Sequence, residues 1–129
     1  MSDIREGAEL VAFVGASDLA RSDRFYAGTL GLELVERTDF ANVYLTGRAT
    51  LRVTHVEQVA PAPYTVLGWN VNDIRAAIAS LTARGVAFTR YDGMAQDDDG
   101  VWRSPGGALV AWFRDPDANT LSLTQPPIG

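Results

Sequence analysis

Two five-residue segments carry the polar side chains best placed for chemistry. Residues 50–54 read TLRVT and residues 120–124 read TLSLT, so Arg52 and Ser122 occupy the same position in two similar strands. A guanidinium is a planar fork of donors that binds a carboxylate, a phosphate or a carbonyl oxygen. The alternative is an ordinary surface ion pair for Arg52 and a plain strand position for Ser122. No base stands in an evident place to activate the serine as a nucleophile.

Side chains alternate between the two faces of a strand, which groups further candidates with Arg52 and Ser122. Hydroxyls on the same face come from both segments: Thr50, Thr54, Thr120 and Thr124. Leucines and valines at the intervening positions should pack beneath helices. The same alternation places Val11 and Phe13 on this face of an earlier strand, and Val66 on that of its counterpart in the second half. Apolar side chains with hydroxyls and one arginine suit an organic ligand.

Aromatic residues supply further candidates for ligand contact. Trp112 alternates with Phe113, so it faces the polar side of its strand if Phe113 packs under a helix. Trp102 follows an acidic stretch and could close over it. Both are candidates because tryptophan is a flat platform for rings and cations, although it is also simple buried bulk. Phe40 and Tyr44 are less clear candidates, with the core slightly favoured.

The elements that position these residues follow one order, β-α-β-β-β, written twice. In the first half a strand over 9–17 precedes a helix that starts at Asp18 and ends before Gly31, and three strands follow over 32–39, 41–47 and 49–57. In the second half a strand over 63–71 precedes a helix capped by Asn72 or Asp73 and ended by Gly85. Three strands then cover 86–91, 108–115 and 119–125.

We therefore predict a single domain over 1–129, with one module at about 8–57, a Pro-rich linker over 58–63 and a second module at about 64–125. The second module carries extra residues within 91–107, a stretch rich in Gly and Asp. A loop of that length in a compact domain is either mobile or functional. Its run of three aspartates is a solvated loop or an acidic rim that attracts a cation.

Composition narrows the class of protein. The chain has 129 residues, of which 47% are apolar, and a formal net charge of -5, which argues against a nucleic-acid partner because that needs a clustered basic face. No cysteine is present, so disulfides, thiolate nucleophiles and cysteine-built zinc sites are excluded. No signal peptide and no stretch of membrane-spanning length is evident. We expect a cytoplasmic protein without a membrane partner.

The repeat and two motifs, SDLARSDRFYAGTLGLEL over 17–34 and AWFRDPDANTLSL over 111–123, resemble the vicinal oxygen chelate superfamily. This superfamily includes glyoxalase I, extradiol dioxygenases, fosfomycin resistance enzymes and bleomycin resistance proteins. The resemblance covers essentially the whole chain. It implies an α+β fold in which two tandem β-α-β-β-β modules form curved mixed sheets around a hollow, with the helices on the outer face. It also implies a homodimer.

In the metal-dependent members of that superfamily, each half supplies ligands from its first and last strands. Carried over, these positions fall on Val11 and Arg52, and on Val66 and Ser122. Valine has no donor atom and arginine is a fixed cation. The chain has one histidine, His55, at the end of its strand. The resemblance therefore implies a metal-free member, and we expect no metal site, no cofactor and no catalytic residue.

Three functions remain open at this point. The first is a metal-independent binding protein resembling bleomycin resistance proteins, which sequesters an aromatic or glycopeptide-like compound and so confers antibiotic resistance. Rings would stack on Trp112, Trp102 and Phe13, while Arg52 orients polar groups. The second is a glyoxalase- or dioxygenase-like enzyme of the same fold, that is, a lyase, isomerase or oxygenase. The third is a regulatory or protein-interaction module.

Overall fold

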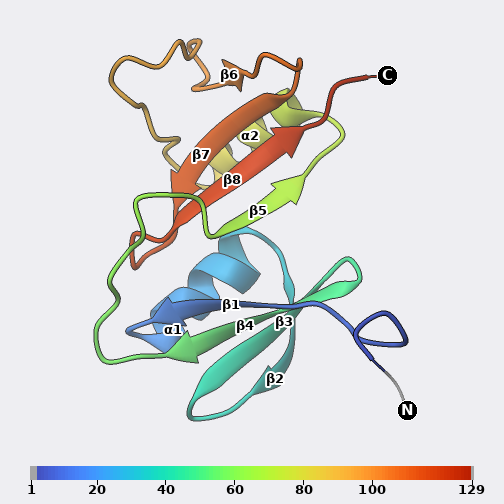
Figure 1. The fold of residues 1–129 in the computed structure, drawn as a ribbon. Coiled ribbons are helices and arrows are strands. Elements are labelled where there is room, and N and C mark those ends of the chain that lie inside the picture. Colours follow the sequence, from blue (N-terminus) through green and yellow to red (C-terminus); the bar gives the residue numbers. More distant parts are fainter. Residues whose placement is uncertain (1–2, 129) are drawn as a thin grey trace. The chain divides into compact units, whose positions relative to one another are not determined.

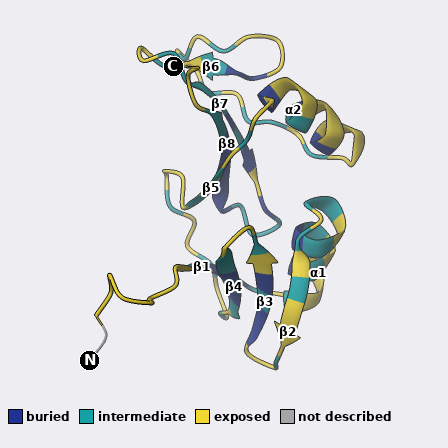
Figure 2. Ribbon diagram, turned by 90° about the vertical axis from the view of Figure 1, so that its right-hand side faces the viewer, coloured by how far each residue is buried: buried dark blue, intermediate teal, exposed yellow. Residues whose placement is uncertain are grey.

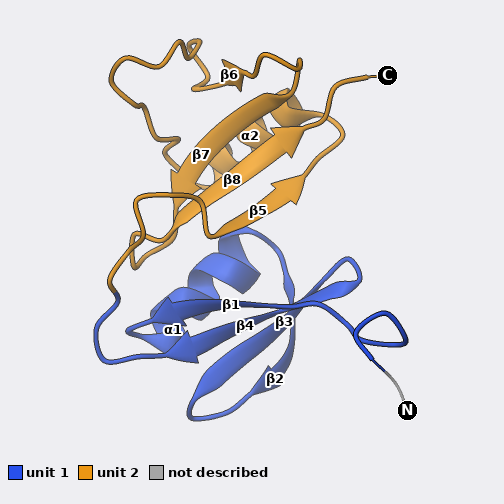
Figure 3. Cartoon of the chain, viewed as in Figure 1, with its two compact units in different colours: residues 1–59 blue, residues 60–129 orange. Residues whose placement is uncertain are grey.

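The structure is a computed structural model that describes residues 3–128. It contains two compact units, residues 1–59 and 60–129, and the boundary falls within the Pro-rich segment 58–63 (Figure 3). The first unit consists of β1 (Val11–Ala16), α1 (Leu19–Asp23), η1 (Arg24–Thr29), β2 (Glu33–Arg37), β3 (Ala41–Thr46) and β4 (Ala49–His55). The second consists of β5 (Leu67–Asn70), α2 (Ile74–Ala83), β6 (Trp102–Arg103), β7 (Leu109–Arg114) and β8 (Thr120–Gln125) (Figure 1).

Each unit is built around one four-stranded mixed sheet. The strand order is β1-β4-β3-β2 in the first unit and β5-β8-β7-β6 in the second. In both, the first strand runs parallel to the last strand of the same unit, and the other neighbours are antiparallel. The predicted α+β class and the repeated β-α-β-β-β order are therefore confirmed.

Both helices begin and end where the sequence predicts. Asp18 accepts a hydrogen bond from the Arg21 amide at 3.0 Å, which lowers the pKa of its carboxyl, and Asp73 accepts one from the Ala76 amide at 3.1 Å. Gly31 and Gly85 follow the two helical segments with φ of +78° and +96°. That left-handed conformation favours glycine because it has no Cβ. The first helix differs from expectation in widening into the π-helical η1, in which the Leu30 amide bonds the Phe25 carbonyl.

The core of each unit lies between the sheet and its helix, and Figure 2 shows buried residues in the strands and in the helices. In the second unit Ile74, Ile78 and Leu81 of α2 are buried, and they belong to a core with four strand residues: Ala111, Phe113, Leu121 and Leu123. In the first unit the buried residues include Leu51, Val53 and Tyr26. Leucines and valines of TLRVT and TLSLT thus pack as their alternation predicts. Each sheet has an opposite face that its helix does not cover, called the open face below.

One predicted strand is wrong. Residues 86–91 do not form a strand, although the Thr89 amide donates a hydrogen bond to the Trp112 carbonyl of β7 at 2.7 Å. The edge position beside β7 belongs instead to the two-residue β6, which pairs with Leu109 and Val110. Phe88 still packs on Phe113, with ring centroids 5.4 Å apart. Alternating apolar residues in this segment therefore reflect core packing and not a full strand ladder.

A buried carboxylate organises the turn between β7 and β8. The side chain of Asp115 accepts hydrogen bonds from the Asp117 amide at 3.0 Å, the Asn119 amide at 2.9 Å and the Asn119 side-chain amide at 2.8 Å. Ala118 sits in this turn with φ of 66°, an uncommon conformation for a residue other than glycine. The conspicuous motif around DPDAN is thus a structural turn, which fixes where β8 starts.

Within residues 3–128, no helix is long and apolar enough to cross a membrane.

Candidate ligand-binding site

The open face of the second sheet brings Trp112 and Ser122 together. The register places Gly68 of β5 beside Ser122 of β8, and Ser122 beside Trp112 of β7. Trp112 is partly exposed, whereas Phe113, its neighbour in the strand, is fully buried on the helix side. Trp112 therefore faces the open side, the orientation inferred from alternation. Ser122 is 8% exposed, because the neighbouring strands flank it on both sides.

Three aromatic rings meet on this face. Tyr91 stands edge-on to Trp112, with ring centroids 5.5 Å apart and an interplanar angle of 89°. Trp102 lies tilted against the same indole at 6.2 Å. The indole Nε1 of Trp112 donates to the Thr65 hydroxyl at 3.1 Å, so its polar group is already satisfied. This trio holds Trp112 in one orientation and leaves its ring as an apolar surface.

A pocket of about 300 Å³ adjoins the Trp112 ring. Its lining residues share an aromatic, apolar or hydroxyl character: Pro63, Tyr64, Thr65, Tyr91, Met94, Trp112 and Thr120. No carboxylate, imidazole, amine or guanidinium is among them. That volume is at the lower end of small-molecule sites, which are lined mainly by apolar and aromatic groups with a few polar ones. The pocket can therefore hold a planar ring against Trp112 while Thr65 and Thr120 offer hydroxyls.

Sequence reasoning missed five lining residues: Pro63, Tyr64, Thr65, Tyr91 and Met94. Tyr91 and Met94 lie at the start of the loop that lengthens the second module, where no periodicity relates a side chain to the sheet. Tyr64 and Thr65 precede β5 in a segment without regular structure. The one available signal was the presence of aromatic residues in two Pro- or Gly-rich connections.

The close approach of β5 and β8 depends on a glycine at position 68. A Cβ at this position would lie 2.6 Å from the Ser122 Oγ, well inside van der Waals contact. The Ser122 hydroxyl therefore points across the strand toward Gly68, and a side chain there would collide with it. The two strands can pair this closely because positions 68 and 122 are both small.

We expect Gly68→Ala to lower the free energy of unfolding by about 1–2 kcal/mol through this collision. Combining it with Ser122→Ala should recover most of the loss, because the next nearest atoms are the Ser122 carbonyl oxygen at 3.4 Å and Cβ at 3.9 Å. Urea unfolding of the two single variants and the double variant measures this coupling. Simple additivity of the two changes would contradict the proposed contact.

The open face of the first sheet carries Arg52 among apolar side chains. Phe13 of β1 and Val43 of β3 flank Arg52 of β4 in one cross-strand row, and Val11 and Leu45 flank Thr50 in the next. Phe13 is 63% exposed, and Arg52 is half-buried. Among the described residues of the first unit, no carboxylate forms an ion pair with the Arg52 guanidinium. This arrangement suits an anionic or carbonyl group as a partner for Arg52.

Tyr44 requires a correction: it does not line the open face. It is fully buried and pairs with Leu51 and Leu34, whose parity points to the helix. Its hydroxyl donates to Asp23 at 2.7 Å, and the same carboxylate accepts from Arg37 at 2.8 Å. Burial, together with this bond to a carboxylate, raises the pKa of Tyr44. The residue is therefore part of the core.

Phe40 and Val66 lie at the ends of strands. Phe40 is 74% exposed in the bend before β3, where its carbonyl accepts from the His55 amide at 2.7 Å. Val66 is 40% exposed just before β5, and its amide donates to the Thr120 carbonyl. Neither belongs to the pocket beside Trp112, so their place in a ligand site stays a prediction.

The residues at the superfamily's metal-ligand positions do not fit a metal. Two of the four are valines and Arg52 is cationic, which leaves one hydroxyl, that of Ser122, as a donor. Within residues 3–128, no group of three or more His, Asp or Glu side chains gathers closely enough to hold an ion. His55 is exposed at the end of β4. The side chains at these positions therefore do not form a metal site.

The profile of the Glyoxalase/Bleomycin resistance protein/Dioxygenase superfamily matches residues 10–123 of this chain. The match covers both units and includes both motifs described above. The chain therefore belongs to this superfamily, and the resemblance inferred from the sequence is confirmed at that level. No curated protein matches the chain.

Solved structures with the same fold include members named for different activities. The chain is similar to a lactoylglutathione lyase from Agrobacterium tumefaciens, with 17% identity over 90% of this chain and 91% of that one, at a TM-score of 0.70. A bleomycin resistance determinant encoded on the transposon Tn5 shares 17% identity over 93% and 98% of the two chains, at 0.73. A superfamily member from Sphaerobacter thermophilus shares 25% over 91% and 95%, at 0.71. At 17% identity a likeness shows the fold alone, so function must be argued from the site.

Proposed function

We propose that this protein binds a small aromatic compound without a metal ion and without changing the compound chemically. The observation that carries the proposal is the pocket of about 300 Å³ beside Trp112. Its lining of rings and one thioether provides apolar contact, and the hydroxyls of two tyrosines and two threonines provide hydrogen-bonding groups. The lining contains no carboxylate, imidazole or amine to act as a general base or to activate a nucleophile, and its titratable groups are the phenols of Tyr64 and Tyr91. These features support binding over catalysis.

The pocket lining carries no charged side chain, which favours a neutral compound there. Two of the three aspartates that suggested a cation-attracting rim, Asp97 and Asp99, form ion pairs with Arg75 at 2.7 and 2.9 Å. The single guanidinium offsets one of these two negative charges, and neither carboxylate lines the pocket beside Trp112. On the first unit, the Arg52 guanidinium lies among apolar side chains without a carboxylate partner from that unit. A strongly cationic glycopeptide finds no carboxylate partner in the pocket lining and none beside Arg52 among the described residues of the first unit.

Three probes with one ring system and different charges test this proposal: naphthalenemethanol, naphthoate and naphthylmethylammonium. Tryptophan fluorescence and calorimetry should show saturable binding of the neutral and anionic probes, with the cation weakest. Absence of saturable binding for all three would overturn the proposal and favour a regulatory or protein-interaction module. A bound probe that is recovered chemically altered would favour the enzymatic alternative.

Arg52→Gln tests the anion contact on the first unit. We expect about a tenfold loss of affinity for naphthoate held on the open face of the first unit, since hydrogen bonds to charged groups contribute about 1.5–3 kcal/mol, and no change in the binding of naphthalenemethanol beside Trp112. Arg48→Gln, at an exposed position in the turn between β3 and β4, removes the same charge and is the control. An equal loss in both variants would indicate a general effect of net charge and not a contact.

The homodimer expected from the sequence also stays a proposal. Phe13, Val11 and Leu45 are exposed apolar residues of the first unit, and β1 and β5 are edge strands of their sheets. Exposed apolar side chains beside an unpaired edge favour association with another copy. Sedimentation equilibrium measures the mass directly.

A further inference from the structure

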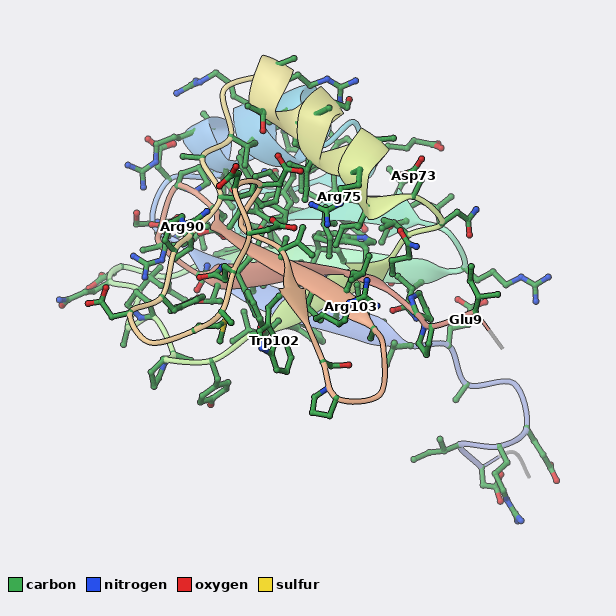
Figure 4. The ribbon with its side chains drawn as sticks, turned by 90° about the horizontal axis from the view of Figure 1, so that it is seen from above. Glu9, Asp73, Arg75, Arg90, Trp102 and Arg103 are labelled. Atoms are coloured by element: carbon green, nitrogen blue, oxygen red, sulfur yellow. The ribbon has the colours of Figure 1, made fainter. Side chains whose placement is uncertain are left out.

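One arginine of α2 fastens the loop that forms a wall of the pocket. Arg75, in the first turn of the helix, uses one terminal nitrogen for Asp97 at 2.7 Å and the other for Asp99 at 2.9 Å. Figure 4 labels Arg75, together with Arg90 and Trp102. A planar guanidinium that donates to two carboxylates fixes the direction as well as the length of both hydrogen bonds. Residues 97–99 are therefore tied to the helix at two points.

Inside the loop, a second set of hydrogen bonds connects this attachment to the two ends. Asp97 also accepts from the Asp99 and Val101 amides, both at 3.0 Å. The side chain of Gln96 accepts from the Tyr91 amide at 2.7 Å and donates to the Gly100 carbonyl at 2.8 Å. The backbone of Gln96 also forms a bridge with Trp102. The segment from Tyr91 to Trp102 is thus held as one body around Gln96 and Asp97.

The ends of this body are the residues that meet Trp112. Tyr91 and Met94 line the pocket, and the rings of Tyr91 and Trp102 contact the Trp112 indole from two directions. Arg75 is not among the lining residues. Any movement of the loop relative to α2 would move these side chains relative to Trp112, which belongs to the sheet.

We propose that Arg75 is a positioning residue for the aromatic pocket: by holding Asp97 and Asp99 it fixes the loop, and through the loop it sets the affinity for a ring bound against Trp112. This inference rests on the proposed function and gives the acidic run a role within the fold. The pKa of the Asp97 carboxyl is lowered, chiefly by its hydrogen bond with Arg75, which agrees with an attachment that has a favourable free energy. Without Arg75 the three adjacent carboxylates would repel one another.

Loss of Arg75 should loosen the loop and leave the fold intact. The helix retains its buried face of Ile74, Ile78 and Leu81. Arg90 still donates to the Asp97 carbonyl at 2.6 Å, and Gln96 keeps its contacts. The expected change is therefore a wider distribution of positions for Tyr91, Met94 and Trp102, which lowers affinity by reducing preorganisation.

The experiment compares Arg75→Gln and the double variant Asp97→Asn with Asp99→Asn against Asp98→Asn, using naphthalenemethanol as the probe. Asp98 is the matched control because it belongs to the same acidic run but makes no ion pair with Arg75. We expect affinity to fall about three- to tenfold in the first two variants, as the loss of ion pairs of up to about 1 kcal/mol each implies, and to stay within about twofold in Asp98→Asn. Amide hydrogen exchange at Tyr91, Gly100 and Val101 should accelerate in the same two variants.

The outcomes separate this inference from the proposed function. Wild-type protein that fails to bind the probe overturns the proposed function and with it this role of Arg75. If the wild type binds the probe, and Arg75→Gln and the aspartate double variant bind it with the same affinity as the wild type, only the positioning role is overturned. Because the probe is uncharged, a direct effect of charge on its binding is excluded. The aspartate double variant leaves Arg75 in place, so a loss of affinity seen in both variants cannot come from a defect of α2 itself.

Discussion

Trp112→Ala is expected to weaken binding of naphthalenemethanol about 30-fold, a loss of about 2 kcal/mol, which is typical of a buried aromatic contact at the centre of a binding site. Trp112 is the pocket residue that both Tyr91 and Trp102 contact, and its Nε1 is bonded to Thr65. Removing the indole would take away the flat surface and free both neighbouring rings to move. Calorimetric titration of the wild type and the variant measures the change.

Two further tryptophan variants separate ring contact from other effects. Trp112→Phe keeps an aromatic surface but loses the hydrogen bond to Thr65, so its affinity should lie between those of the wild type and the alanine variant. Trp69→Phe changes a tryptophan on the helix-facing side of β5 and should leave affinity unchanged. If Trp112→Ala binds the probe as the wild type does, the pocket beside Trp112 is not the binding site.

Asp115→Ala is expected to lower the free energy of unfolding by about 3 kcal/mol. The carboxylate is 6% exposed and accepts three hydrogen bonds, two of them from Asn119. Alanine would leave buried donors of Asn119 without partners, and each such group costs about 1–3 kcal/mol. A loss of this size is a large fraction of the total stability of a small protein. Urea unfolding monitored by circular dichroism measures it.

Two controls accompany this substitution. Asp92→Ala removes an exposed carboxyl and should change stability by less than about 0.5 kcal/mol. Asp115→Asn keeps one oxygen acceptor but turns a donor toward the Asn119 side chain, so its loss should be intermediate. Equal stability of Asp115→Ala and Asp92→Ala would show that the hydrogen bonds of the turn contribute no net stability.

Features decided by local chemistry were predictable from the sequence. Asp18 and Asp73 cap helices because a carboxylate can accept from an amide three residues on, and Gly31 and Gly85 end them because a left-handed residue is needed there. Strand alternation gave the faces of Arg52 and Trp112 for a similar reason, since a period of two applies to any strand. With the repeat, these rules were enough for the fold.

Features decided by contacts between distant segments were not predictable. Residues 86–91 carry an apolar pattern suited to a strand, yet β6 takes their edge position because the chain returns after the loop. The assignment of Tyr44 to the core depends on Asp23, which lies in α1. Tyr91 and Met94 reach Trp112 because Gln96 and Arg75 hold the loop, and no spacing in the sequence encodes that attachment.

The parallel pairing of the first and last strand in each unit has a consequence for how the superfamily fold accommodates change. Because β5 pairs with β8, the chain between these two strands forms a closed loop, and this loop includes the segment before β7. The entropy cost of such closure grows only with the logarithm of the enclosed length. The length of segment 91–107, which walls the pocket, is therefore only weakly constrained by the entropy of closing the sheet.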